Sequence, residues 1–146
     1  MNKLNKIIFF FAAVLGLLVF NGCKDDEEVF PTFEQPGWKA EQSPDFTASM
    51  IAIVQLPENL AAYYQSGDEV AAFIGDECRG VGTYGDGVFY MLVKSKSDEQ
   101  RMVTFKYYSS RNKYMYATAG NVRFEVDGVY GTADNPEVLS LQVVGK

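Results

Sequence analysis

Three aspartates stand where the chain is expected to turn, and their carboxylates are the groups best suited to hold a metal ion. Asp68, Asp76 and Asp86 each neighbour a glycine in a short turn-forming stretch. Calcium takes six to eight oxygen ligands, which such turns can supply, although the spacing matches no EF-hand loop. Asp in a tight turn more often hydrogen-bonds the backbone of its own turn. We therefore expect no cofactor, with calcium at these three residues as the alternative.

Aromatic side chains form the candidate ligand-binding set. Tyr107 and Tyr108 lie in one expected strand, Tyr114 and Tyr116 lie in the next, and Trp38 precedes the first strand. Alternate residues of a strand face opposite sides, so one set of tyrosines should face outward. Exposed tyrosines provide rigid contact area with a hydrogen-bonding tip, which suits sugars and protein surfaces. The alternative is that these rings pack across strands at the edge of the core.

Other features argue against catalysis. The chain contains no histidine, which removes Ser-His-Asp and Cys-His pairs and every histidine-containing metal site. A glycosidase pair needs two carboxylates facing each other across a cleft, and a small domain with tight turns offers little cleft. Cys78 flanks an apolar strand and is expected to be buried, while Arg79 is expected to bond turn carboxylates such as Asp76 or Asp86. We predict that the protein is not an enzyme.

Short strands must position these residues. Residues 45–56 alternate between apolar and polar side chains, and Pro57 ends the pattern before one or two helical turns within residues 58–65. The other expected strands cover residues 70–74, 78–84, 88–93, 101–108, 114–118, 122–126 and 138–144, with a charged loop at 94–100. Strands of this length and spacing predict an all-β fold, a single antiparallel β-sandwich (Ig-like or jelly-roll-like) of about seven to nine strands.

The first 22 residues have the pattern of a signal peptide. Lys3 and Lys6 precede an apolar run over residues 7–20, which as a helix would span about 21 Å, short of the roughly 30 Å hydrocarbon core. Gly22-Cys23 resembles the cleavage box of bacterial lipoproteins, in which the cysteine becomes the lipidated N-terminus. The acidic run at 24–28 resembles the export signal of Bacteroidetes surface lipoproteins. This resemblance implies lipidation of Cys23 and attachment to the outer membrane, facing the cell exterior.

The rest of the chain divides into a tether and a folded domain. Residues 23–37, with Pro31 and Pro36, are interpreted as a lipidated acidic tether, and residues 38–146 as the β-sandwich domain. Within that domain, residues 68–81, 103–108, 131–132 and 135–136 resemble a β-sandwich module that recurs in secreted and surface proteins of Bacteroidetes. The resemblance implies a fold and a compartment but supplies no catalytic residues.

Charge limits the partners of the domain. The net charge is −6, and since two of the 13 basic residues lie in the leader, 19 acidic residues face 11 basic ones from Cys23 onward. This excess disfavours nucleic acid, whose phosphates would be repelled. We expect a surface-exposed lipoprotein that displays a binding or adhesion module for a glycan or a surface protein. The alternative is a structural spacer subunit of an outer-membrane assembly with no ligand of its own.

Overall fold

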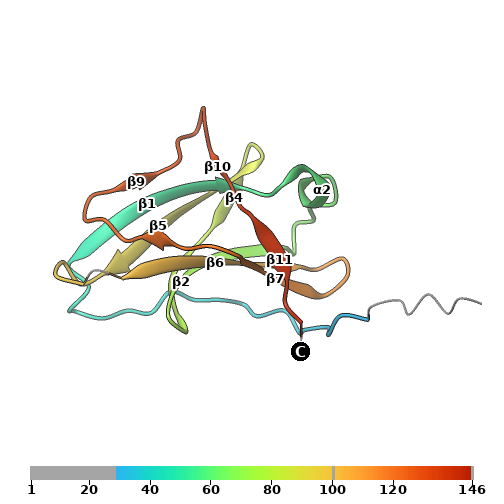
Figure 1. Ribbon diagram of the computed structural model, residues 1–146, viewed down its shortest axis with the longest axis horizontal. Coiled ribbons are helices and arrows are strands. Elements are labelled where there is room, and N and C mark those ends of the chain that lie inside the picture. Colours follow the sequence, from blue (N-terminus) through green and yellow to red (C-terminus); the bar gives the residue numbers. More distant parts are fainter. Residues whose placement is uncertain (1–28, 100, 146) are drawn as a thin grey trace, which may run out of the picture.

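The computed structural model describes residues 29–99 and 101–145, so the expected signal peptide and Cys23 lie outside the described residues. The described chain is nearly all β: two sheets, mainly antiparallel, pack face to face and do not close into a barrel (Figure 1). The predicted β-sandwich is therefore confirmed. It has eleven strands instead of the expected seven to nine, because several pairings involve only two or three residues.

Sheet A has the order β10-β1-β5-β4, with β9 also paired to β1. β1 and β5 run antiparallel over seven residue pairs, while β9 and β10 each add a two-residue parallel pairing to the other edge of β1. Its strands are β1 (Ala48–Gln55), β4 (Thr83–Gly85), β5 (Val88–Ser95), β9 (Val129–Tyr130) and β10 (Glu137–Val138). The only helix of the described chain is the single turn α2 (Glu58–Ala61), directly after Pro57.

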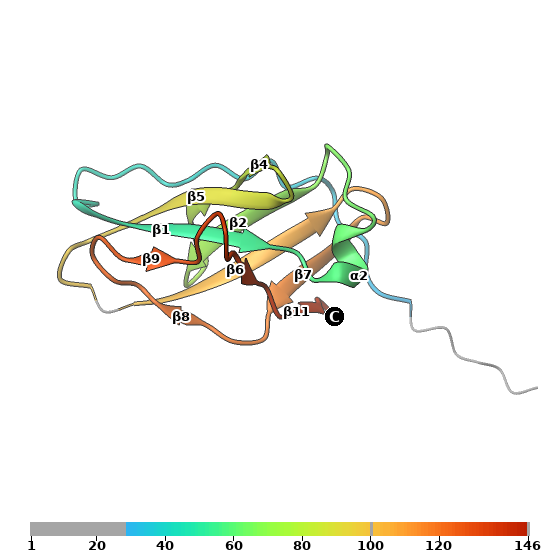
Figure 2. The same ribbon diagram turned by 90° about the horizontal axis from the view of Figure 1, so that it is seen from above.

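Sheet B has the order β11-β7-β6-β2-β3, with β8 also paired to β6, and all its pairings are antiparallel. Its strands are β2 (Glu69–Ile74), β3 (Glu77–Val81), β6 (Met102–Ser109), β7 (Tyr114–Thr118), β8 (Val122–Arg123) and β11 (Leu141–Val143). Figure 2 shows how the two layers overlap when viewed onto sheet A.

The core lies between the two sheets and follows the period-two pattern. On β1 the even-numbered apolar residues are buried and those between them are more exposed, as the alternation predicts. Phe89, Phe105 and Tyr107 are the largest side chains that are almost completely buried. They meet between the sheets within one continuous apolar cluster.

The expected strand over residues 78–84 is two strands, one in each sheet. β3 ends at Val81 in sheet B and β4 begins at Thr83 in sheet A, so the chain changes sheets at Gly82. The backbones come close there: a Cβ added at Gly80 would lie 2.7 Å from the carbonyl oxygen of Leu92. Glycine is therefore required where β3 of one sheet crosses β5 of the other.

The C-terminal third has shorter strands than predicted. The expected strand at 122–126 pairs only over β8, and the one at 138–144 is divided between β10 and β11 in different sheets. β9 (Val129–Tyr130) lies between the expected strands at 122–126 and 138–144, where no strand was predicted. Pairings of two residues are too short for an alternating pattern to reveal.

The N-terminal segment (residues 29–47) lies against the domain. It runs in an extended path along the outer side of sheet B, from the turn between β6 and β7 to the opposite end of the sandwich (Figures 1 and 2). The Phe33 N–H donates to the Lys113 carbonyl at 2.8 Å, and the Glu41 N–H donates to the Cys78 carbonyl at 2.8 Å. Residues 29–37, expected to be part of the tether, are thus packed on the sheet. In the described part of the chain, no helix is long and apolar enough to cross a membrane.

Candidate functional site

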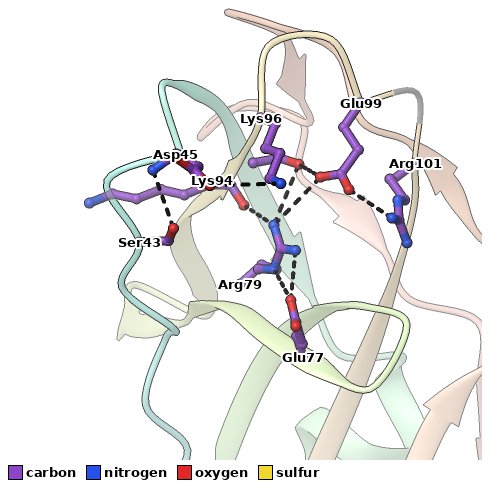
Figure 3. Close-up of polar contacts among 9 residues, drawn as sticks. Ser43, Asp45, Glu77, Arg79, Lys94, Lys96, Glu99 and Arg101 are labelled. Atoms are coloured by element: carbon purple, nitrogen blue, oxygen red, sulfur yellow. Dashed lines mark hydrogen bonds and ion pairs between the residues drawn. The ribbon is translucent and has the colours of Figure 1, made fainter.

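A charged cleft opens at the end of the sandwich away from the turn between β6 and β7, where the N-terminal segment begins (Figure 1). It has a volume of about 600 Å³. The end of the N-terminal segment, the turn between β2 and β3, and the loop after β5 surround it (Figure 3). The residues used below are Glu41, Asp45, Phe46, Asp76, Glu77, Arg79, Lys96, Glu99 and Arg101, which together are called the Arg79 cleft.

Arg79 lies at the base of this cleft and is only 5% exposed. Its Nε and Nη2 donate to Glu77 Oε2 at 3.0 and 2.7 Å, and its Nη1 donates to the Lys94 carbonyl at 3.3 Å. The guanidinium also lies 4.0 Å above the ring of Phe46. A planar cation that bonds a carboxylate and stacks on an aromatic face is held rigidly. Arg79 was expected to bond Asp76 or Asp86, and it bonds Glu77 instead because β3 places the two side chains on the same face, two residues apart.

Glu99 joins the two sides of the cleft. Its Oε2 accepts a hydrogen bond from the Ser95 hydroxyl at 2.9 Å, and its Oε1 lies 2.8 Å from Nη2 of Arg101. The hydrogen bond from Ser95 is the main reason why the pKa of Glu99 is lowered, and the charges of Arg101 and Arg79 lower it further. Glu77, Arg79, Glu99 and Arg101 therefore form a row of alternating charge across the cleft (Figure 3).

The rim of the cleft is more acidic than basic. Five acidic residues line it against three basic ones. Glu41, Asp45, Asp76 and Glu77 are all exposed, and among the described residues the Asp45 carboxylate forms only a long 3.8 Å ion pair with Lys96. Carboxylate oxygens can accept hydrogen bonds from the hydroxyl groups of a ligand, and the neighbouring guanidinium and ammonium groups can donate to them. The net negative charge is unfavourable for a polyanion.

The three aspartates proposed for calcium do not meet. Asp76 and Asp86 lie in different hairpin turns, and within the described residues no three His, Cys, Asp or Glu side chains are placed to share a metal ion. Asp68 is buried, and its two oxygens accept four hydrogen bonds from within the protein, from Tyr107 Oη (2.6 Å), Ser110 Oγ (2.7 Å), Ser110 N (2.8 Å) and Gln65 N (3.1 Å). Asp68 thus organises a turn, which is the alternative role that its sequence context indicated.

The predicted tyrosine platform is not exposed. Tyr107 and Tyr116 face the core and stack with their ring centres 5.5 Å apart. Tyr108 is buried, and its hydroxyl donates to the Phe33 carbonyl at 3.4 Å. Tyr114 packs edge-on against Phe30. The outward-facing tyrosines are therefore covered by the N-terminal segment. The rings pack against other parts of the protein, which was the alternative to ligand binding.

Trp38 has a similar covering role. Its ring packs edge-on against Phe73 with the ring centres 5.5 Å apart, and its backbone N–H donates to Glu69 Oε2 at 3.1 Å. Cys78 belongs to the same small apolar cluster on the outer side of sheet B. The thiol is free and buried, as predicted, and its burial raises its pKa.

No protein family, no curated protein and no solved structure matches this chain. The site is therefore defined by its geometry alone.

Sequence reasoning missed most of the Arg79 cleft. Of its residues, Asp76 was predicted as a possible metal ligand and Arg79 as a structural cation, whereas Phe46, Lys96 and Glu99 were not considered as a group. The available signal was the run of charged residues at 94–101 beside the end of an apolar strand. Residues 94–101 lie beside residues 41–46 only because of long-range packing, which a local sequence pattern does not show.

Proposed function

We propose that the protein is a non-catalytic binding lipoprotein that presents the Arg79 cleft to a hydroxyl-rich glycan. In this proposal, lipidated Cys23 holds the domain at the outer membrane. The observation that carries the proposal is the position of the cleft, at the end of the sandwich opposite the residue where the described chain begins (Figure 1). A domain tethered near Val29 would present this end toward the surroundings.

The size and chemistry of the cleft support a glycan ligand. A volume of about 600 Å³ lies within the usual range for small-molecule sites. Sugar hydroxyls both donate and accept hydrogen bonds, which matches a site that offers carboxylate acceptors next to guanidinium donors. The acidic rim favours a neutral or amine-bearing sugar over a sulfated or phosphorylated one.

A glycan array probed with the protein lacking its first 23 residues tests this function. We expect binding to a restricted set of neutral or amino-sugar glycans. Asp76→Asn and Glu41→Gln should each weaken that binding about tenfold, because each replaces a charged acceptor on the rim. Asp134→Asn is the matched control, since Asp134 is exposed in the loop between β9 and β10. Binding that is absent, or that the rim substitutions leave unchanged, would contradict the proposal.

The alternative function is a spacer subunit without a ligand. It is supported by the bonds of Arg79, which are made within the protein and join β3 to β5 and to the N-terminal segment. In that case the charged row serves to stabilise one end of the sandwich. An empty glycan array together with a large loss of stability in Arg79→Met would favour the spacer.

A further inference from the structure

We propose that the end of the sandwich where the N-terminal segment begins lies on the phosphate-bearing lipid headgroups of the membrane. This inference rests on the proposed lipidation of Cys23. The contact is made by residues 62–67, which follow α2, and by residues 110–113, the turn between β6 and β7; together they are called the tether-end surface. Both views show α2 and this turn at the same end of the sandwich (Figures 1 and 2).

The two segments are joined into one surface. The Arg111 guanidinium lies 4.1 Å from the centre of the Tyr63 ring. The Ser110 hydroxyl lies within hydrogen-bond distance of the Gln65 side chain at 3.4 Å, and the Ser110 backbone N–H donates to the buried Asp68 at 2.8 Å. Tyr63 and Arg111 are therefore held side by side, and both are exposed.

A short stretch of chain separates this surface from the proposed lipid. The Phe33 N–H donates to the Lys113 carbonyl, so the N-terminal segment leaves the domain beside the turn. From Cys23 to Val29 an extended chain reaches at most about 21 Å, at 3.5 Å per residue. A tether of this length keeps the surface near the headgroups at a millimolar effective concentration, so even a weak contact keeps it docked.

The charge of the tether-end surface suits phosphate groups. It contains Arg111 and Lys113 and no acidic residue. In the described chain neither of these two forms an ion pair, whereas Arg79, Lys96 and Arg101 at the other end of the sandwich all do. Basic side chains at a membrane surface are attracted to anionic headgroups. The two unpaired cations of the domain's tethered end are therefore available to phosphates.

The net negative charge of the domain acts mainly elsewhere. The acidic rim of the Arg79 cleft is separated from this end by β1, whose eight residues span about 26 Å. Charges more than about 8 Å apart in water are largely screened at physiological salt. Two exposed acids, Glu34 and Glu58, flank the surface. The attraction therefore comes from close contact with phosphates and not from a long-range field.

Tyr63 supplies a second kind of contact. Its ring is 57% exposed. Tyrosine rings are favoured at headgroup level, where the ring is partly removed from water and the hydroxyl stays hydrated. Arg111 stacks on this ring and keeps its N–H donors in the guanidinium plane, where two of them can bond one phosphate. The acidic run at 24–28, which lies outside the described residues, would bind the two cations but would not cover a ring whose face is negative.

The lipidated full-length chain, extracted from membranes and inserted into vesicles, tests this docking. The vesicles contain phosphatidylethanolamine with a quarter of phosphatidylglycerol and a trace of lipid that carries a spin label on its headgroup. In a Cys78→Ser background, a fluorophore is attached at Ser66→Cys, within the surface, or at Gln42→Cys, beside the Arg79 cleft. We expect at least about fivefold more quenching at position 66, because only this position would lie among the headgroups.

The outcomes separate the docking from the anchor. A chain that does not float with the vesicles would disprove the lipid anchor and the docking with it. A chain that floats but is quenched equally at the two positions would overturn the docking alone, and the proposed function would stand.

A matched pair of charge reversals tests the residues that make the contact. In the Ser66→Cys background, Arg111→Glu should reduce the quenching about fivefold, because a cation near the phosphates becomes an anion. Arg123→Glu is the control, since Arg123 is exposed and pairs with Met102 at the end of β6 away from the turn. Quenching that Arg111→Glu does not reduce, or that Arg123→Glu reduces equally, would overturn the proposal.

Micelles of a maltoside detergent, which carry no phosphate, separate the headgroups from the acidic run at 24–28 as the partner of this surface. The rate at which a water-soluble maleimide modifies Ser66→Cys is measured in micelles and in vesicles, with Gln42→Cys as the reference in both. We expect the relative rate to be at least about threefold higher in micelles, because the phosphates that hold the surface are missing there. Equally slow modification in both would mean that the acidic run covers the surface, and would overturn the docking.

Discussion

At the scale of single residues, the turn around Asp68 shows how one buried carboxylate organises its surroundings. Its oxygens accept hydrogen bonds from the preceding loop through Gln65, from strand β6 through Tyr107 and from the next turn through Ser110. Each of these donors is partly or fully removed from water, so a donor left without its partner would be costly. The site is structural, and it connects segments 42 positions apart in the sequence.

Asp68→Ala should therefore destabilise the protein strongly. We expect the free energy of unfolding to fall by about 3 kcal/mol, because four donor groups lose their buried acceptor. Urea denaturation followed by Trp38 fluorescence measures the change. Asp134→Ala, at an exposed loop position, should stay within about 0.5 kcal/mol of the wild type. A similarly small effect at Asp68 would show that water replaces the carboxylate.

Tyr107 is expected to make the free energy of unfolding fall at high pH. Burial, followed by the hydrogen bond to Asp68, raises the pKa of Tyr107. A raised pKa in the folded state means that the unfolded chain loses this proton first as the pH rises above about 10. The stabilising contribution is thus fully present below that pH and is lost above it.

Tyr107→Phe should accordingly flatten the decline of stability above about pH 10. The free energies of unfolding of the two proteins, measured between pH 8 and 11, provide the check. A residual slope is expected, since burial also raises the pKa of Tyr64 and of Tyr130. An unchanged slope would assign the alkaline limit to the other groups whose pKa burial raises, which are Tyr64, Tyr130 and Cys78.

At the scale of elements, the passage of the chain from β3 to β4 depends on close backbone contact. Gly80→Ala should lower the free energy of unfolding by about 2 kcal/mol, because its Cβ would lie 2.7 Å from a backbone oxygen that cannot rotate away. At Gly85 an added Cβ would meet only the ring of Tyr90, at 3.7 Å. Gly85→Ala is thus the matched control and should change stability by less than about 0.5 kcal/mol in urea denaturation.

The N-terminal segment is an element without regular secondary structure, and Trp38 is its main apolar contact. Trp38→Ala should lower stability by about 2 kcal/mol, less than for a fully buried ring. It should also uncover Cys78, whose modification by a maleimide can be followed by peptide mass spectrometry. Lys39→Ala, at the exposed neighbouring position, should leave the labelling rate unchanged. Equal labelling in both variants would mean that the segment does not protect this face.

The alternating pattern of the sequence predicted the long strands β1 and β6 well, because each of them buries one side along most of its length. It did not predict which sheet each strand joins. The only sign in the sequence of the change of sheet at Gly82 is a cluster of small residues around it. The tyrosines of β6 and β7 show the same limit. Alternation predicts that Tyr107 and Tyr108 face opposite sides of the sheet, but it cannot reveal that residues 30–38 cover the ring that faces outward.

At the scale of the whole molecule, the start of the N-terminal segment and the Arg79 cleft lie at opposite ends of the sandwich (Figure 1). The proposed membrane attachment predicts that Cys23→Ala moves the protein from the membrane pellet to the soluble fraction, because the acyl chains that would hold it are lost. Fractionation of cells and incorporation of labelled palmitate measure this. Cys78→Ser is the control and should remain in the pellet, since that thiol is buried in the domain. A Cys23→Ala protein that stays in the pellet would argue for another mode of attachment.

The path of the N-terminal segment also bears on how the protein would respond to mechanical force. A pull transmitted through residue 29 would act first on Phe30 and Phe33, then on Trp38, and only afterwards on the strands, because the contacts follow one another along the segment. Peeling these residues away one after another would release roughly 60 Å of chain at about 3.4 Å per residue. The segment would thus extend under load and delay the unfolding of the sandwich behind it.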